Sequence, residues 1–195
     1  MRRLALSLAL VVAAAPSAAC ADGSTSSYLP LKQGNRWTYQ DARTGGETTV
    51  TAARVRPGVF RLEGFPGASS LCVRWSGGVL QAWDGGQRRW ESFLRLGAPK
   101  GTAYRVDLPH PLWEQVRVTV ASRTATVKVD PLERSFSRAV RLTLRPSPEL
   151  SDAGITSMVF APGVGLVLWE ELTFTGTVTH ALSSARVGDR TLGRR

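Results

Sequence analysis

Apolar and polar residues alternate along most of the chain beyond residue 27, with the period of two that is typical of β-strands. The segment 172–182 alternates apolar residues with four threonines, which predicts one half-buried antiparallel strand. The segments 116–120 and 140–145 show the same alternation. Weaker versions of the pattern predict further strands at 48–55, 59–62, 70–75, 79–83, 88–94, 124–130 and 155–160.

Turn residues separate these segments at short intervals, and we expect little helix, with 131–138 as the best candidate. Roughly ten short strands at this spacing predict an all-β domain, folded as a single strongly curved antiparallel sheet or an open β-barrel. The breaks are Gly45-Gly46, Arg56-Pro57-Gly58, Gly77-Gly78, Gly85-Gly86 and Pro146-Ser147-Pro148.

The chain begins like a bacterial export signal. Arg2 and Arg3 precede an unbroken apolar run at 4–15, and small residues follow up to Cys20. The run is too short to span a bilayer as an ordinary helix. We therefore expect a signal peptide at 1–19, a flexible stalk of small and polar residues at 20–27, and a β-rich domain at 28–195.

The residues around Cys20 resemble a bacterial lipoprotein signal, which implies that the cysteine sulfur is acylated and anchors the protein in a membrane. Ser17 departs from that pattern, because a large aliphatic residue is usual at this position. Cleavage after Ala19 or Ala21 would instead release a soluble periplasmic protein. Asp22 does not directly follow Cys20, so the inner-membrane retention signal is absent. We expect a lipid anchor on the periplasmic side of the outer membrane.

The charge of the chain does not identify a partner. It carries 25 basic and 15 acidic residues, for a net charge of +10. A positive protein can attract anionic lipid headgroups or nucleic acid. However, 22 of the 25 basic residues are arginines, a skew expected of a GC-rich genome, and they do not cluster around aromatic residues. We expect no nucleic-acid partner, and the oligomeric state stays open.

Two motifs near the ends of the domain suggest a family. The segment 28–39, YLPLKQGNRWTY, and the segment 160–167, FAPGVGLV, resemble the opening and closing motifs of a group of uncharacterised bacterial envelope lipoproteins. The chain departs from that group at 131–136, where PLERSF lacks a usual glycine. The resemblance implies no activity. Residues 164–169 are apolar at both parities, which predicts a strand that is covered on both faces or lines a cavity.

The sequence shows little catalytic or metal-binding chemistry. Its two histidines and two cysteines have no short ligand spacing, and no Gly-x-Ser-x-Gly motif is present. We expect no metal, no cofactor and no enzymatic activity. Cys72 must be unpaired if Cys20 is acylated, and could bridge to Cys20 if it is not.

Four tryptophans and one histidine are the speculative ligand-binding residues. They could line a surface that binds an apolar or amphipathic ligand, although core packing explains large aromatic side chains equally well. Three functions follow: a non-enzymatic envelope lipoprotein with such a ligand, a structural or assembly component of an envelope complex, and a periplasmic hydrolase. The five residues are Trp75, Trp83, Trp90, Trp169 and His180.

Overall fold

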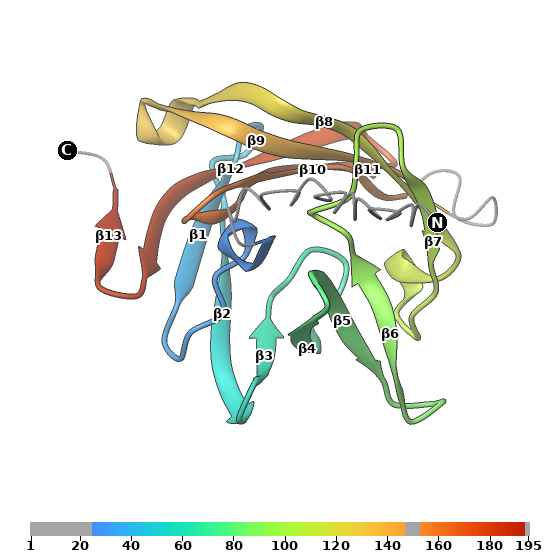
Figure 1. The fold of residues 1–195 in the computed structure, drawn as a ribbon. Helices are drawn as coiled ribbons and strands as arrows, with labels where there is room; N and C mark the ends of the chain where they lie inside the picture. Colours follow the sequence, from blue (N-terminus) through green and yellow to red (C-terminus); the bar gives the residue numbers. More distant parts are fainter. Residues whose placement is uncertain (1–24, 147–152, 194–195) are drawn as a thin grey trace, which may run out of the picture.

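Thirteen strands form one antiparallel sheet in the computed structural model of the protein, which describes residues 25–146 and 153–193 (Figure 1). The predicted signal peptide, Cys20 and the first part of the predicted stalk lie outside these residues. The rest of the predicted stalk, residues 25–27, belongs to the 3-10 turn η1 (Thr25–Tyr28). The strands are β1 (Arg36–Asp41), β2 (Glu47–Arg56), β3 (Val59–Glu63), β4 (Ser70–Ser76), β5 (Val79–Asp84), β6 (Arg89–Leu94), β7 (Ala103–Val106), β8 (Val116–Val129), β9 (Arg134–Arg145), β10 (Gly154–Ala161), β11 (Gly165–Thr173), β12 (Gly176–Val187) and β13 (Arg190–Leu192).

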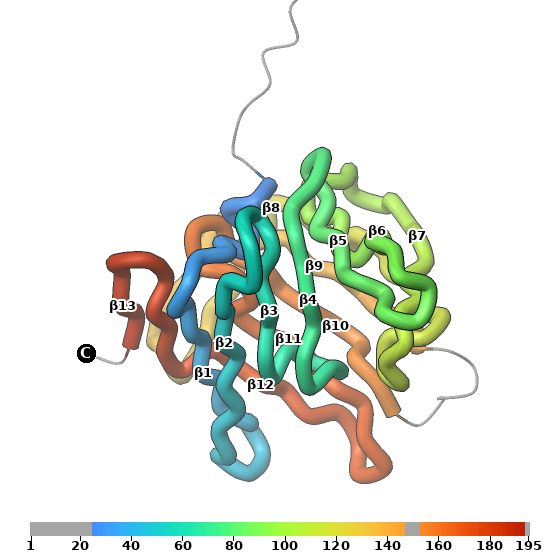
Figure 2. The backbone as a smooth tube through the Cα atoms, turned by 90° about the horizontal axis from the view of Figure 1, so that it is seen from below, coloured from blue at the N-terminus to red at the C-terminus, as the bar shows by residue number. Residues whose placement is uncertain are grey.

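The order of the strands makes the sheet a nearly closed barrel. It runs β6-β5-β4-β3-β2-β1-β12-β11-β10-β9-β8-β7, and β13 pairs with β12. The first strand, β1, is therefore hydrogen-bonded to the twelfth, β12, although the two are far apart in the sequence. The two end strands of the sheet, β6 and β7, come into contact. Seen from below, β2 to β5 lie in front of β9 to β11 (Figure 2). The predicted all-β fold with one strongly curved antiparallel sheet is confirmed, with thirteen strands rather than about ten.

The ends of β8 and β9 form a hairpin arm, residues 122–138, that extends past the pairing of β9 with β10. Three register shifts interrupt the pairing of β8 with β9, and Arg138 adopts a left-handed φ of 56°, so the ladder bends here. The tip of the arm contains the 3-10 turn η3 (Asp130–Leu132), which contacts β12. In Figure 1 the arm lies over the outer side of the sheet.

The arm explains why the strands beneath it are apolar on both faces. Seven of the eight residues of β10 are buried, as are four of the first five residues of β11. One face of these strands packs into the barrel, and the other face lies under the arm. Val129 and Phe136 of the arm are buried as well. The best helix candidate of the sequence, 131–138, is not a helix, because the 3-10 turn η3 ends at Leu132 and β9 starts at Arg134.

The predicted strand at 172–182 is a hairpin. β11 ends at Thr173 and β12 begins at Gly176, which has a φ of +103° that favours glycine. The Thr173 hydroxyl donates to the carbonyl oxygen of Gly176 at 2.8 Å. Phe174 therefore lies at an exposed turn, with 91% of its surface accessible, and not on a buried face. Among the described residues there is no helix with the length and hydropathy needed to cross a bilayer.

The two motif segments contact each other in the barrel core. Trp37 of β1 donates its indole N–H to the carbonyl oxygen of Val164 at 2.6 Å, and the Tyr39 hydroxyl donates to that of Leu166 at 2.9 Å. Asn35 is 1% exposed; its amide donates to Pro30 O at 2.7 Å and its carbonyl oxygen accepts Gly188 N–H at 2.8 Å. Structural contacts thus account for five of the motif residues: Asn35, Trp37, Tyr39, Val164 and Leu166.

Candidate functional site

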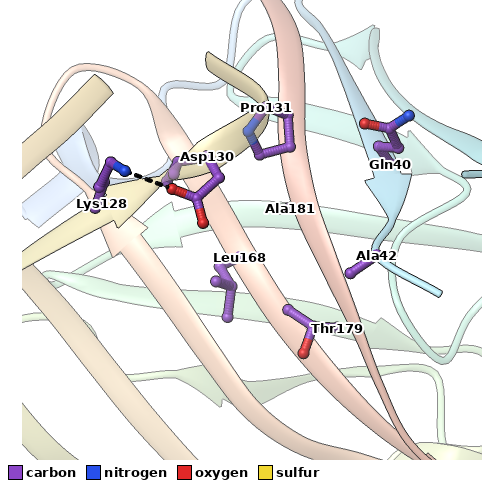
Figure 3. A pocket seen from close by; sticks show the side chains of 9 residues that line it. Gln40, Ala42, Lys128, Asp130, Pro131, Leu168, Thr179 and Ala181 are labelled. Atoms are coloured by element: carbon purple, nitrogen blue, oxygen red, sulfur yellow. Dashed lines mark ion pairs between the residues drawn. The ribbon is translucent and has the colours of Figure 1, made fainter. Parts of the chain in front are cut away.

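A groove of about 320 Å³ lies on the outer face of the sheet, between the hairpin arm and strands β1, β11 and β12 (Figure 3). The strand alternation places its lining outward. On β12, Thr179 and Ala181 line the groove while His180 faces the barrel interior, and on β11 Leu168 lines it while Trp169 faces inward. The lining residues are Gln40, Ala42, Lys128, Val129, Asp130, Pro131, Leu168, Thr179 and Ala181.

The groove combines an apolar sheet surface with a charged edge. Leu168 and Ala181 supply apolar surface from the sheet. On the arm, Lys128 Nζ lies 2.9 Å from Asp130 Oδ1, and both side chains are more than two-thirds exposed, at 72% and 81%. The hydrogen bond that Lys128 donates to Asp130, together with the attraction of the Asp130 charge, raises the pKa of Lys128 above its usual value. A molecule in the groove would meet apolar surface on one side and a solvated ion pair on the other.

The interior of the barrel is filled with side chains. Trp37, Tyr39, Phe93, Trp113 and Phe160 are all among its largest fully buried residues. The rings of Phe93 and Trp113 meet edge to face with centroids 4.6 Å apart, and Trp113 donates its indole N–H to Pro66 O at 2.8 Å. This side of the sheet is a packed core at these positions, so the groove on the outer face is the better site for a ligand.

Trp169 and His180 come together inside the barrel, as neighbours on β11 and β12. Their rings stack with centroids 4.4 Å apart and an interplanar angle of 13°. Tyr39 also contacts Trp169, edge to face with ring centroids 4.4 Å apart. Two carboxylates are near His180: Glu171 Oε2 is 3.8 Å from its Nε2, and Asp41 lies opposite it on β1.

The environment of His180 favours the neutral imidazole. Burial lowers its pKa below the usual 6.5, and it outweighs the opposing attraction of Asp41 and Glu171. The Nδ1 atom is buried without a hydrogen-bond partner among the described residues. His180 faces away from the groove, so it does not belong to the same site.

The other three predicted tryptophans do not form one shelf. Trp83 and Trp90 meet edge to face on the outer side of β5 and β6, with centroids 5.4 Å apart. Arg74 covers the Trp90 ring at 4.4 Å and donates from Nε to Gln81 Oε1 at 2.8 Å. Trp75 faces the opposite side of β4 and donates its indole N–H to Leu29 O at 3.1 Å. The structure thus separates the five predicted residues into two pairs and one single residue.

Potential metal ligands and thiols are scattered in the described part of the chain. Within residues 25–146 and 153–193, no three His, Cys, Asp or Glu side chains are grouped so that they could hold a metal ion. Cys72 is a free, half-buried thiol in this part of the chain, and its possible partner Cys20 lies outside it. The predictions for these two cysteines stay predictions.

The groove was not predicted as a site. Its lining consists of common residue types from four separated segments of the chain, without a motif. The one sequence signal near it is the apolar character of residues 164–169 at both parities, which indicated a strand covered on both faces or lining a cavity. Both parts of that alternative apply to β11: it is buried on both faces, and Leu168 lines the groove.

Comparison with known proteins finds no matching family model and no curated protein that matches the chain. Two solved structures show a distant likeness. One is described as an exported protein of Bacteroides fragilis with a YmcC-like fold; it is 13% identical, with a TM-score of 0.42 over 80% of this chain and 97% of that chain. The other is described as a lipoprotein of Parabacteroides distasonis, 12% identical, with a TM-score of 0.38 over 82% and 98%. Neither likeness assigns a family or an activity.

Proposed function

We propose that the protein is an exported, non-enzymatic binding protein of the bacterial cell envelope. It is held on the periplasmic side of the outer membrane by acylated Cys20 and takes a small amphipathic ligand in the outer groove. The arginine-headed apolar leader and the small residues before Cys20 support export and anchoring. The observation that carries the binding role is the groove itself, with an apolar surface on the sheet and an ion pair on the arm.

The shape and chemistry of the groove limit the ligand. Small-molecule pockets have volumes of about 300–1,000 Å³, so a groove of about 320 Å³ accommodates a small ligand or part of a larger one. Leu168, Ala181 and Pro131 offer contacts to an apolar segment, whereas Lys128 and Asp130 suit a polar or charged group at its end. A single acyl chain attached to a polar head has both features.

The other two hypotheses have weaker support. A role in assembling a larger complex would require an exposed apolar patch that contacts the partner. Among the described residues the exposed large apolar side chains are Val55 and Phe174, which belong to different hairpins. A hydrolase would need its catalytic groups beside the ligand, and His180 lies on the other face of β12 from the groove.

Native mass spectrometry of the protein purified from membranes tests the binding role. We expect a copurifying ligand on the wild type and its loss from Ala181→Trp, because the indole would fill the groove. Ala53→Trp is the matched control, since Ala53 lies on β2, outside the lining of the groove. Absence of any ligand from the wild type, or equal loss from both variants, would contradict the proposal.

A further inference from the structure

Three arginines lie side by side on the outer face of neighbouring strands. Arg105 of β7 is directly opposite Arg117 of β8, and Arg117 is directly opposite Arg145 of β9. All three are exposed, and they alternate with buried residues such as Val106 and Val118, so their side chains project outward. We refer to Arg105, Arg117 and Arg145 as the arginine row.

The arginine row places like charges at close range. Directly opposite residues of antiparallel strands have Cα atoms about 4.5–5.5 Å apart, and like charges at this spacing destabilise the sheet. No carboxylate in the described part of the chain forms an ion pair with any of the three. Asp107, which follows β7, accepts the backbone N–H of Gln115 at 3.1 Å. Three neighbouring guanidinium groups therefore retain donors for an external anion.

A hollow of about 310 Å³ lies at one end of the row. Arg105 and Arg117 line it from two strands, together with Ala103, Tyr104 and Gln115. Gln115 adopts a left-handed φ of 55° just before β8 begins. The hollow also borders β7, the strand at one end of the hydrogen-bonded sheet. The arginines thus flank a recess and not only a flat surface.

We propose that the arginine row is a binding site for a phosphate group, either free or as the headgroup of a lipid. A guanidinium group matches the geometry of a phosphate by two parallel N–H···O bonds, and two such groups from adjacent strands can hold one phosphate between them. The anion also removes the repulsion between the arginines. This site is separate from the outer groove, which is lined by residues 128–131 at the other end of β8.

Calorimetric titration of the mature full-length protein in a neutral detergent tests this proposal. The probes are inorganic phosphate and dihexanoyl phosphatidic acid, a soluble lipid with a phosphate headgroup. We expect the double variant Arg105→Gln/Arg117→Gln to weaken binding at least about tenfold. Binding of both probes with similar affinity identifies a general phosphate site, and binding of the lipid alone identifies a headgroup site; both outcomes support the proposal.

A second arginine pair provides a matched control. Arg36 and Arg186 are also exposed and directly opposite each other, on β1 and β12. The variant Arg36→Gln/Arg186→Gln removes the same charge from another part of the sheet, and we expect it to leave the affinity unchanged. Absence of binding of both probes to the wild type, or an equal loss in the two double variants, would overturn the proposal. Circular dichroism of each variant establishes that it is folded.

Discussion

The indole N–H of Trp37 donates to the carbonyl oxygen of Val164 at 2.6 Å, across 127 positions of the sequence. Both residues are buried, and the bond fixes the turn before β11 against β1. β11 lies between β10 and β12, beneath the hairpin arm, and its Leu168 lines the outer groove. The position of the groove therefore depends on a contact made inside the barrel.

Replacing Trp37 tests the strength of this contact. Trp37→Phe removes the donor and leaves the buried carbonyl oxygen of Val164 without a partner, so we expect the free energy of unfolding to fall by about 2 kcal/mol. Urea denaturation followed by circular dichroism measures the change. Trp90→Phe is the control, because Trp90 is only half-buried, and we expect it to have a smaller effect. Equal losses would show that the hydrogen bond is unimportant.

Gly165 is the second test of the same contact. A Cβ atom at this position would lie 2.9 Å from Trp37 Nε1, and the backbone φ is +116°. We expect Gly165→Ala to lower the free energy of unfolding by more than about 2 kcal/mol, since overpacking adds to the backbone strain. Gly163 also has a positive φ, +73°, but a Cβ there would meet nothing within 4 Å.

The comparison of the two glycine variants separates the two causes. Gly163→Ala should show the backbone strain alone, about 1–2 kcal/mol. If thermal denaturation gives the same loss for Gly165→Ala, then the contact with Trp37 contributes nothing to the need for glycine at position 165.

The sequence predicted the curved sheet because the period of two is a local property of each strand. For example, the alternation at 116–120 predicts a strand with one buried face without any knowledge of the neighbouring strands. The structure confirms this, because Val116, Val118 and Val120 are all buried. The same alternation continues through the threonines between 173 and 179, so it predicted one strand where the structure has two strands and a turn. Threonine suits strands and turns alike, so the pattern did not reveal the turn that exposes Phe174.

The outer groove could not be predicted for a related reason. Val127 and Val129 of the arm alternate like the residues of any half-buried strand, and the pattern does not tell whether they pack into the barrel or against its outer face. The bend at Arg138 decides this, and the sequence there contains no glycine or proline to mark it. The candidate residues Trp83 and Trp90 are neighbours on adjacent strands, whereas Trp75 faces the other side of the sheet.

The environment of His180 predicts a specific pH dependence of stability. Burial lowers the pKa of His180 in the folded protein below its usual 6.5, so the unfolded chain binds the proton more readily. The wild type should therefore lose stability as the pH falls below about 6.5, until it passes the pKa of the folded state. Above that range His180 should have no such effect. Urea midpoints between pH 5 and pH 7.5 measure the loss.

A pair of histidine variants isolates the effect of His180. We expect His180→Gln to reduce the loss of stability between pH 7 and pH 5, because glutamine does not titrate. His110→Gln removes the other histidine of the sequence and should retain the pH dependence of the wild type. An unchanged profile in His180→Gln would show that the buried imidazole does not contribute to it.

Acylation of Cys20 can be tested on the mature protein. If the thiol is the attachment point, the mature protein begins at Cys20, carries acyl chains and sediments with membranes, because several acyl chains give lasting anchorage. Mass spectrometry of the intact mature protein measures the start and the added mass together. Cys20→Ala should lose both the acyl mass and the membrane association, whereas Cys72→Ala should keep them, since Cys72 is half-buried on β4. A wild-type protein that has lost its leader but carries no acyl mass would contradict anchoring while leaving export intact.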